Sequence, residues 1–272
     1  MIGYLRGAYH AWLDYPLPAG YELQRRYRLL RSLGEGSYGL AYLAMDAASG
    51  SPVVLKQARP SKRELGRRLL IREQEALQVL GHPDLPACGA LIEERRHLWL
   101  PIEWVDGATV EDLIFTQRRG FTELESLKFL ERLLPVVAFI HERGWVHLDL
   151  RIPNVMDCAG RLKLIDFGLA RRIGDMEGLE APQNGEEERR RLPRVESDLY
   201  ALGHFLLFLL YASYEGKPGQ EERGWQEELD LSEATARLLN RLMGEDAVYP
   251  SAAALAGDVG QAVAALSSQP GR

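Results

Sequence analysis

Short hydrophobic runs, some of them beside a Gly-containing turn, recur within the first hundred or so positions. Such runs occupy residues 27–43, on both sides of the sequence GEGSYG at positions 34–39, and residues 51–56. Runs of this length predict antiparallel strands. A further strand is expected over residues 97–105, with Asp106-Gly107 turning the chain out of it. Residues 1–26 show no such pattern and are predicted to be an extension ahead of the first strand.

One helix is expected among these strands. Ser61 with Glu64 predicts a capping box that opens a helix extending to about Leu80, and His82-Pro83 would end it. Leu69, Glu73, Leu77 and Leu80 share one face of that helix. Glu73 is therefore expected to point inward among leucines.

The second half of the chain has helical periodicity. Thr122 with Glu125 predicts a capped helix extending to about Gly144, and Pro135 within it predicts a kink or a local break. Residues 197–211 are apolar on nearly every side, which is typical of a buried central helix. Two more helices are expected near residues 232–243 and 251–266. The charge run at 186–191 has no predicted structure.

Composition narrows the class of protein. The chain has 272 residues, of which 46% are hydrophobic, so it can bury the core of one large domain or two lobes. A net charge of −6 makes nucleic acid an unfavourable default partner. Its two cysteines suit a reducing compartment. With no signal-peptide pattern and no apolar run near the about 18 residues of a membrane span, the sequence predicts a cytoplasmic protein.

Two motifs in the middle of the chain carry the candidate chemistry. Residues 147–154 read HLDLRIPN, and Asp166-Phe167-Gly168 follows after one short hairpin's length. Asp149 is a candidate proton acceptor, and Asn154 and Asp166 are oxygen ligands of the kind that Mg²⁺ prefers. This combination predicts phosphoryl transfer.

With the upstream Gly-rich turn and Lys56, the chain resembles the protein kinases, in particular the bacterial serine/threonine kinases of the eukaryotic-like type, over residues 27–266. The resemblance implies an α+β, bilobal fold. A small antiparallel lobe with one helix would span residues 27–102, and the hinge with a mainly helical lobe would span 103–272. It also implies ATP as cofactor with Mg²⁺ or Mn²⁺, and a protein substrate with a Ser or Thr acceptor.

The same resemblance assigns site residues. The turn at Gly34, Glu35, Gly36, Ser37 and Gly39 would cover the nucleotide phosphates, because it continues into a strand rather than a helix. Lys56 would hold the α- and β-phosphates and pair with Glu73. Asp149 would orient the acceptor hydroxyl and take its proton, beside Arg151. Asn154 and Asp166 would be the metal ligands.

A nucleotide-base pocket is also implied. Ile102 would lie at its back, the Glu103 carbonyl and Val105 amide would meet the adenine edge, and Met156 would form its floor. Ala41 and Val54 exchange the sizes usual in the family, so the summed volume above the base is kept. Asp198 admits two interpretations of equal weight, a helix N-cap or a brace for the backbone of the catalytic loop.

Several positions depart from the family pattern. Leu148 replaces the arginine that normally receives an activation-segment phosphate, and residues 166–196 contain no Ser, Thr or Tyr. Activity is therefore expected not to depend on phosphorylation of this segment. The usual Ala-Pro-Glu is at best Ala181-Pro182-Gln183, and the arginine that its glutamate would pair with is Val248. Arg151 stands where serine/threonine kinases usually have lysine.

Three alternatives stay open from the sequence. A small-molecule kinase of the aminoglycoside or choline type shares the catalytic loop but generally lacks the full Gly-rich turn and the Asp-Phe-Gly. A pseudokinase or scaffold is disfavoured because the five polar site residues are present. A tyrosine kinase can also have arginine at the position of Arg151.

Overall fold

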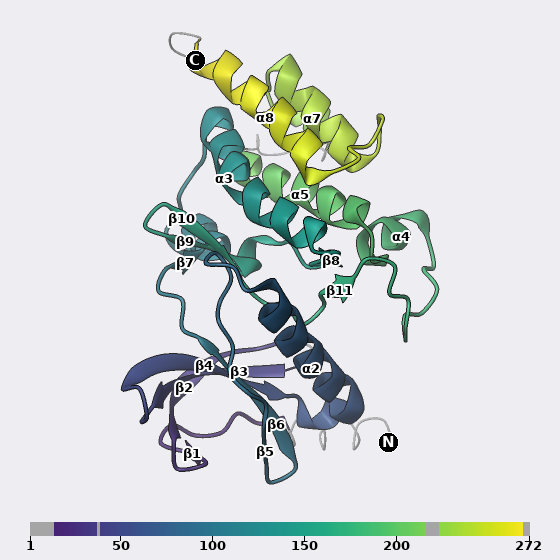
Figure 1. Ribbon diagram of the computed structural model, residues 1–272. Helices are drawn as coiled ribbons and strands as arrows, with labels where there is room; N and C mark the ends of the chain where they lie inside the picture. The colour runs from purple at the N-terminus through teal and green to yellow at the C-terminus, as the bar shows by residue number, and fades with distance from the viewer. Residues whose placement is uncertain (1–13, 37–38, 216–222, 269–272) are drawn as a thin grey trace, which may run out of the picture. The chain divides into compact units, whose positions relative to one another are not determined.

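The computed structural model describes residues 14–36, 39–215 and 223–268, which form two compact units (Figure 1). One unit consists of the chain up to Asp106 together with Asp166–Leu169. The other consists of Gly107–Ile165 and the chain from Ala170 onward. None of the helices in these ranges combines the length and apolarity needed to cross a membrane.

The first unit contains a six-stranded antiparallel sheet with the strand order β1-β2-β3-β4-β6-β5. The strands are β1 (Glu22–Leu23), β2 (Tyr27–Glu35), β3 (Gly39–Asp46), β4 (Ser51–Ala58), β5 (Ile92–Glu94) and β6 (His97–Glu103). The predicted strands are confirmed, although β6 ends two residues before Val105. Strand β1 lies inside the stretch that was expected to be an extension, and it pairs with β2.

Alternation along β3 gives the sheet two different faces. Tyr42 and Ala44 point to a buried cluster that also contains Leu23, Leu55 and Trp99, and Leu17 and Tyr21 of the N-terminal segment pack against it. The opposite face has Lys56 directly across from Ala41. Residues paired across antiparallel strands point to the same side.

The first unit also contains helix α2 (Arg63–Leu80), which follows a short 3-10 helix (Pro60–Lys62). The expected capping box at Ser61 and Glu64 is wrong. Lys62 is the N-cap residue without a side-chain bond, and the Ser61 hydroxyl donates to Asp14 instead. The helix ends at Gly81, whose φ of 45° is in the left-handed region that glycine adopts readily.

The second unit is mainly helical. Its helices are α3 (Glu123–Glu142), α4 (Gly185–Arg191), α5 (Val195–Tyr211), α6 (Trp225–Glu228), α7 (Glu233–Met243) and α8 (Ala252–Ser267), with a π-helical turn (Asp112–Thr116) and a 3-10 turn (Ile152–Asn154). The Thr122–Glu125 capping box is confirmed. Helix α3 continues through Pro135, so the expected local break is absent. Pro135 and Glu131, whose carbonyl loses its helical donor, are both exposed, and water can satisfy that carbonyl.

Short strands complete this unit. Strands β7 (Ala108–Thr109), β9 (Val155–Cys158) and β10 (Arg161–Leu164) form one small sheet, and β8 (Trp145–Val146) pairs with β11 (Arg171–Arg172). Helix α5 is mostly buried, as predicted. At its Gly203 an added Cβ would lie 3.0 Å from Leu242 Cβ, so glycine permits the close approach of α5 and α7.

Candidate active site

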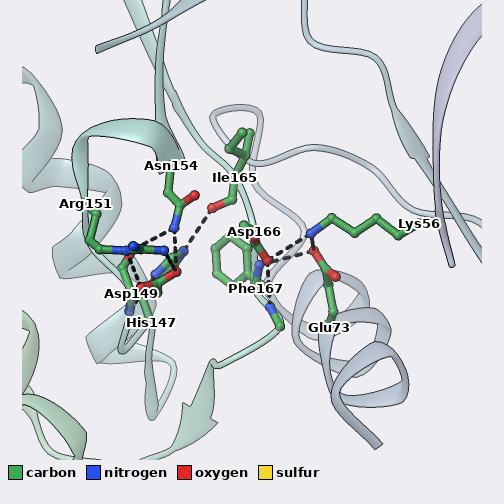
Figure 2. Close-up of polar contacts among 10 residues, drawn as sticks. Lys56, Glu73, His147, Asp149, Arg151, Asn154, Ile165, Asp166 and Phe167 are labelled. Atoms are coloured by element: carbon green, nitrogen blue, oxygen red, sulfur yellow. Dashed lines mark hydrogen bonds and ion pairs between the residues drawn. The ribbon is translucent and has the colours of Figure 1, made fainter. Parts of the chain in front are cut away.

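Lys56 lies between two carboxylates within the first unit (Figure 2). Its Nζ donates to Glu73 Oε1 at 2.6 Å and to Asp166 Oδ1 at 2.9 Å. Glu73 is on the inward face of α2, as its leucine stripe predicted, and its side chain is only 3% exposed. The same oxygen of Glu73 accepts the Phe167 backbone N–H at 3.2 Å. The sequence thus brings a strand, a helix and the Asp-Phe-Gly segment to one cation.

The charge of Lys56 is maintained by this arrangement. Burial alone would lower the pKa of the amine, but the negative charges of Asp166 and Glu73, together with the hydrogen bonds to them, raise its pKa above the usual value. The amine therefore stays a cation at any physiological pH. A fixed cation at the end of a strand is suited to hold phosphate oxygens.

The Gly-rich turn connects β2 and β3 in the same unit. Gly34 pairs with Ala41, Glu35 pairs with Leu40, and the Gly36 N–H donates to the Gly39 carbonyl at 2.9 Å. Ser37 lies outside the described residues.

Glycine at 34 and 36 is not required by the packing of the described residues. An added Cβ would meet nothing within 4 Å at Gly34 and only a carbonyl at 3.6 Å at Gly36, and neither residue has a positive φ. A bound ligand that needs close backbone approach would account for both glycines.

Three of the predicted base-pocket residues, Ala41, Val54 and Ile102, occupy one face of the sheet. Val54 is paired with Leu43 on one side and with Ile102 on the other, while Ala41 lies diagonally across on the same side. Ile102 and Val105 are buried. The N–H of Glu103 donates to the Ala87 carbonyl. Met156 is buried on β9 of the second unit, and its predicted place beneath the base stays a prediction.

Asp149, Arg151 and Asn154 form a second cluster, within the second unit (Figure 2). Asn154 Nδ2 donates to the Asp149 backbone carbonyl at 2.9 Å and to Asp149 Oδ2 at 2.7 Å. Arg151 Nε lies 2.6 Å from Asp149 Oδ1. The Asp149 carboxylate is thus oriented by an amide and a guanidinium. Because the amide nitrogen of Asn154 faces Asp149, its oxygen points away and can serve as a ligand.

Asp198 braces the backbone of this loop. Its carboxylate, only 1% exposed, accepts the His147 and Leu148 backbone N–H groups at 2.8 Å and lies 2.9 Å from His141 Nε2. Leu148 has a φ of 60°, a left-handed conformation that costs a leucine about 1–2 kcal/mol. The N-cap interpretation of Asp198 is wrong, because α5 begins three residues earlier with Arg194 as N-cap.

His147 links the catalytic loop to the residue before Asp166. The Asp149 N–H donates to His147 Nδ1 at 3.2 Å, which leaves Nε2 to donate to the Ile165 carbonyl at 3.2 Å. The sequence motif included His147 but predicted no role for it, and it gave no prediction for His141. The available signal for His141 was a lone histidine directly after the apolar run at residues 133–140.

The segment after Asp-Phe-Gly is held by contacts of its own. Arg171 Nη1 donates to the backbone carbonyls of Asp175 and Glu177, and the charge run at 186–191 forms helix α4, capped by Asn184. Val248, where the family has the arginine that pairs with the segment's glutamate, is 54% exposed. Arg189 instead donates to the carbonyl of Met243 at the end of α7.

Asn154 and Asp166 fit a magnesium ion by the chemistry of their donors. Both present oxygen, and within the described ranges no group of three or more His, Cys, Asp or Glu residues is positioned to hold a metal. Mg²⁺ is commonly bound by few protein oxygens together with water and substrate phosphates. The oxygen that each of these two residues offers is therefore of the kind that Mg²⁺ accepts.

An antiparallel sheet with one helix, a separate helical unit and these two polar clusters define a phosphotransferase of the kinase type. The sequence matches the protein kinase domain family over residues 27–186, and the chain belongs to the protein kinase family.

Two similar proteins are serine/threonine kinases of a bacterium. The chain is 34% identical to a probable serine/threonine-protein kinase of Bacillus subtilis, YbdM, over 93% of this chain and 96% of that protein. It is 30% identical to serine/threonine-protein kinase PrkC of the same species over 70% of this chain and 31% of that longer protein. A crystal structure of another kinase domain has a TM-score of 0.63 at 18% identity, covering 77% of this chain and 71% of that one. This last likeness supports the fold alone.

Proposed function

We propose that this chain is an ATP- and Mg²⁺-dependent protein kinase that transfers the γ-phosphoryl group to Ser or Thr hydroxyls of proteins. The observation that carries the proposal is the position of Lys56 between Glu73 and Asp166. A structural ion pair needs one carboxylate, whereas Lys56 has two. The first orients the amine, and the second belongs to the motif that binds the metal in this family. The names of the bacterial relatives support Ser and Thr as acceptors.

The chain's own residues then have separate tasks. Backbone N–H groups of the Gly-rich turn and the Lys56 amine would bind the phosphates. Asp149 would orient the acceptor hydroxyl and take its proton, while the hydroxyl oxygen bonds to the γ-phosphorus and the bond to the β–γ bridging oxygen breaks. Arg151 would keep positive charge near that phosphoryl group. Mg²⁺ held by Asn154 and Asp166 would neutralise the phosphate charge when bound.

Apolar side chains and backbone groups would bind the adenine. Ala41, Val54 and Ile102 would enclose the adenine within the first unit, and Met156 would contribute from β9. The backbone of Glu103 and Val105 would meet its polar edge.

Cys88 and Cys158 are not joined in a disulfide, which suits the cytoplasmic location that we propose. The net charge of −6 gives no reason to propose a nucleic-acid partner.

Activity should not require phosphorylation of residues 166–196, which contain no hydroxyl side chain. The contacts of Arg171 and of α4 already order much of that segment. Phosphatase treatment of the purified protein should leave its rate unchanged. A rate that falls on phosphatase treatment and recovers only after incubation with another kinase would contradict the proposal.

The function is tested with purified protein, labelled ATP and Mg²⁺ or Mn²⁺, followed by phosphoamino-acid analysis of the products. Asp149→Ala should lower kcat by about 10²- to 10⁴-fold with nucleotide affinity nearly unchanged. Asp230→Ala, at an exposed carboxylate of the same unit, is the matched control. Phosphotyrosine would indicate a tyrosine kinase, transfer only to small alcohols a small-molecule kinase, and no Mg-ATP binding a scaffold.

A further inference from the structure

Arg59 joins the Gly-rich turn to the N-terminal segment. This residue follows directly after β4, and its guanidinium extends in two directions. Its Nη1 donates to the Gly36 carbonyl at 2.7 Å, and its Nε donates to Asp14 Oδ2 at 2.9 Å. Its Nη2 also lies 3.6 Å from Glu35 Oε2. The planar guanidinium of Arg59 therefore bonds to the N-terminal segment and to the Gly-rich turn at the same time.

Asp14 is itself held in place. It is nearly buried, and besides Arg59 it accepts the Ser61 backbone N–H at 2.9 Å and the Ser61 hydroxyl. Burial raises the pKa of the Asp14 carboxyl, but the hydrogen bonds from Ser61 and the charge of Arg59 outweigh this and lower the pKa overall. Asp14 is thus an ionised anchor for the guanidinium.

The segment that carries Asp14 is fixed to the sheet. We call residues 14–23 the N-terminal strap. The Leu17 N–H donates to the Tyr42 hydroxyl at 3.2 Å, Leu17 and Tyr21 pack against the buried cluster of the sheet, and Leu23 pairs with Tyr27. These contacts keep Asp14 at a defined position relative to Arg59. The hold on Gly36 therefore depends on residues far from the turn in sequence.

We propose that Arg59 is a positioning residue that preorganises the Gly-rich turn for nucleotide phosphates, and that Asp14 makes this preorganisation depend on the N-terminal strap. The proposal rests on the proposed function for the identity of the ligand. Fixing a backbone residue costs conformational entropy, and a backbone that Arg59 already holds at Gly36 does not pay this cost there on binding. Nucleotide affinity would thus respond to changes in a segment outside the Gly-rich turn and the other kinase motifs of the chain.

The experiment compares the wild-type chain with Arg59→Ala, Arg59→Lys and Asp14→Asn. Amide hydrogen exchange of the peptide over residues 34–40 is measured without nucleotide, and dissociation constants are measured for ADP and for adenosine. Arg67→Ala is the matched control, since Arg67 pairs with Glu93 on the surface of the same unit.

We expect Arg59→Ala to accelerate exchange of the turn and to weaken ADP binding about 5- to 10-fold, with adenosine affinity within twofold of wild type. Arg59→Lys should restore little, because a single ammonium cannot bridge Asp14 and Gly36. Asp14→Asn should shift both readouts in the same direction by about threefold, and Arg67→Ala should change neither.

Unchanged exchange in Arg59→Ala would overturn the proposal, as would full rescue by lysine. Equal losses for ADP and adenosine would also overturn it, because they would indicate general loosening of the fold. If the wild-type chain binds neither nucleotide, the proposed function fails. In that case the exchange rates of Arg59→Ala and Asp14→Asn still decide whether Arg59 positions the turn.

Discussion

Removing Glu73 tests whether the Lys56 amine must be oriented from the helix. In the structure Glu73 contributes one oxygen that accepts both the amine and the Phe167 N–H. Glu73→Ala deletes both bonds, while Asp166 still accepts from Lys56 at 2.9 Å. The amine therefore keeps a counter-charge but loses the contact that fixes its direction.

The size of the effect of Glu73→Ala depends on the contacts that Lys56 keeps. Stranding a buried charge costs about 3–5 kcal/mol, but Lys56 is not stranded, so the stability loss should be that of one charged hydrogen bond, about 1.5–3 kcal/mol. The kinetic effect should be larger. Misplacement of a binding group by about 1 Å costs about 100-fold, and we expect kcat/KM for ATP to fall by that factor. Glu73→Gln, which keeps an acceptor oxygen without charge, should lose about tenfold.

The assay is steady-state phosphorylation of a protein acceptor at varied ATP, with urea denaturation of each variant to correct for unfolded protein. Glu75→Ala is the control, because Glu75 lies on the same helix but is exposed. Its kcat/KM should stay within twofold of wild type. If folded Glu73→Ala also stays within threefold, the ion pair is structural and the reasoning above is refuted.

Two further perturbations address stability. Asp198→Asn should destabilise the fold by about 1.5–3 kcal/mol, because its single amide oxygen can accept only one of the two bonds from the His147 and Leu148 N–H groups and carries no charge. A loss below about 1 kcal/mol in urea denaturation would contradict the bracing role. Hydrogen bonds from Arg26 lower the pKa of Asp46 from 3.8 to about 2, so its ionised form stabilises the fold above about pH 4 and this stabilisation is lost as the pH falls through about 2. The stability difference between wild type and Asp46→Asn should therefore shrink between pH 5 and pH 2, and a difference that stays constant would refute the assignment.

Periodicity predicted the parts of the fold in which each side chain has one buried direction. The inward position of Glu73 followed from the leucines that share its helical face, and its contact with Lys56 followed from the cost of burying a charge alone. Short apolar runs near the Gly-rich turn likewise located β3 and β4.

The errors arose where a distant residue decides the local structure. Ser61 was expected to cap a helix, but Asp14, 47 positions earlier, takes its hydroxyl. Strand β1 was missed because its loop places Gln24 and Arg25 at positive φ, where the sequence offers no glycine to signal a turn. Asp198 has the residue type of a cap, but its direction depends on backbone donors of another segment.

Order in the activation segment is built from contacts that need no phosphate. The Asp198 brace holds Leu148 at its left-handed φ, where the family usually has the arginine that receives a phosphate. Arg171 fixes the start of the segment through backbone carbonyls, and Arg189 fixes α4 to the end of α7. These contacts are consistent with the proposal that activity does not require phosphorylation of the segment. Within the described residues, Arg59 connects the proposed nucleotide site to the N-terminal strap. A change that moves the strap would therefore alter the Gly-rich turn, and activity would be regulated through these contacts.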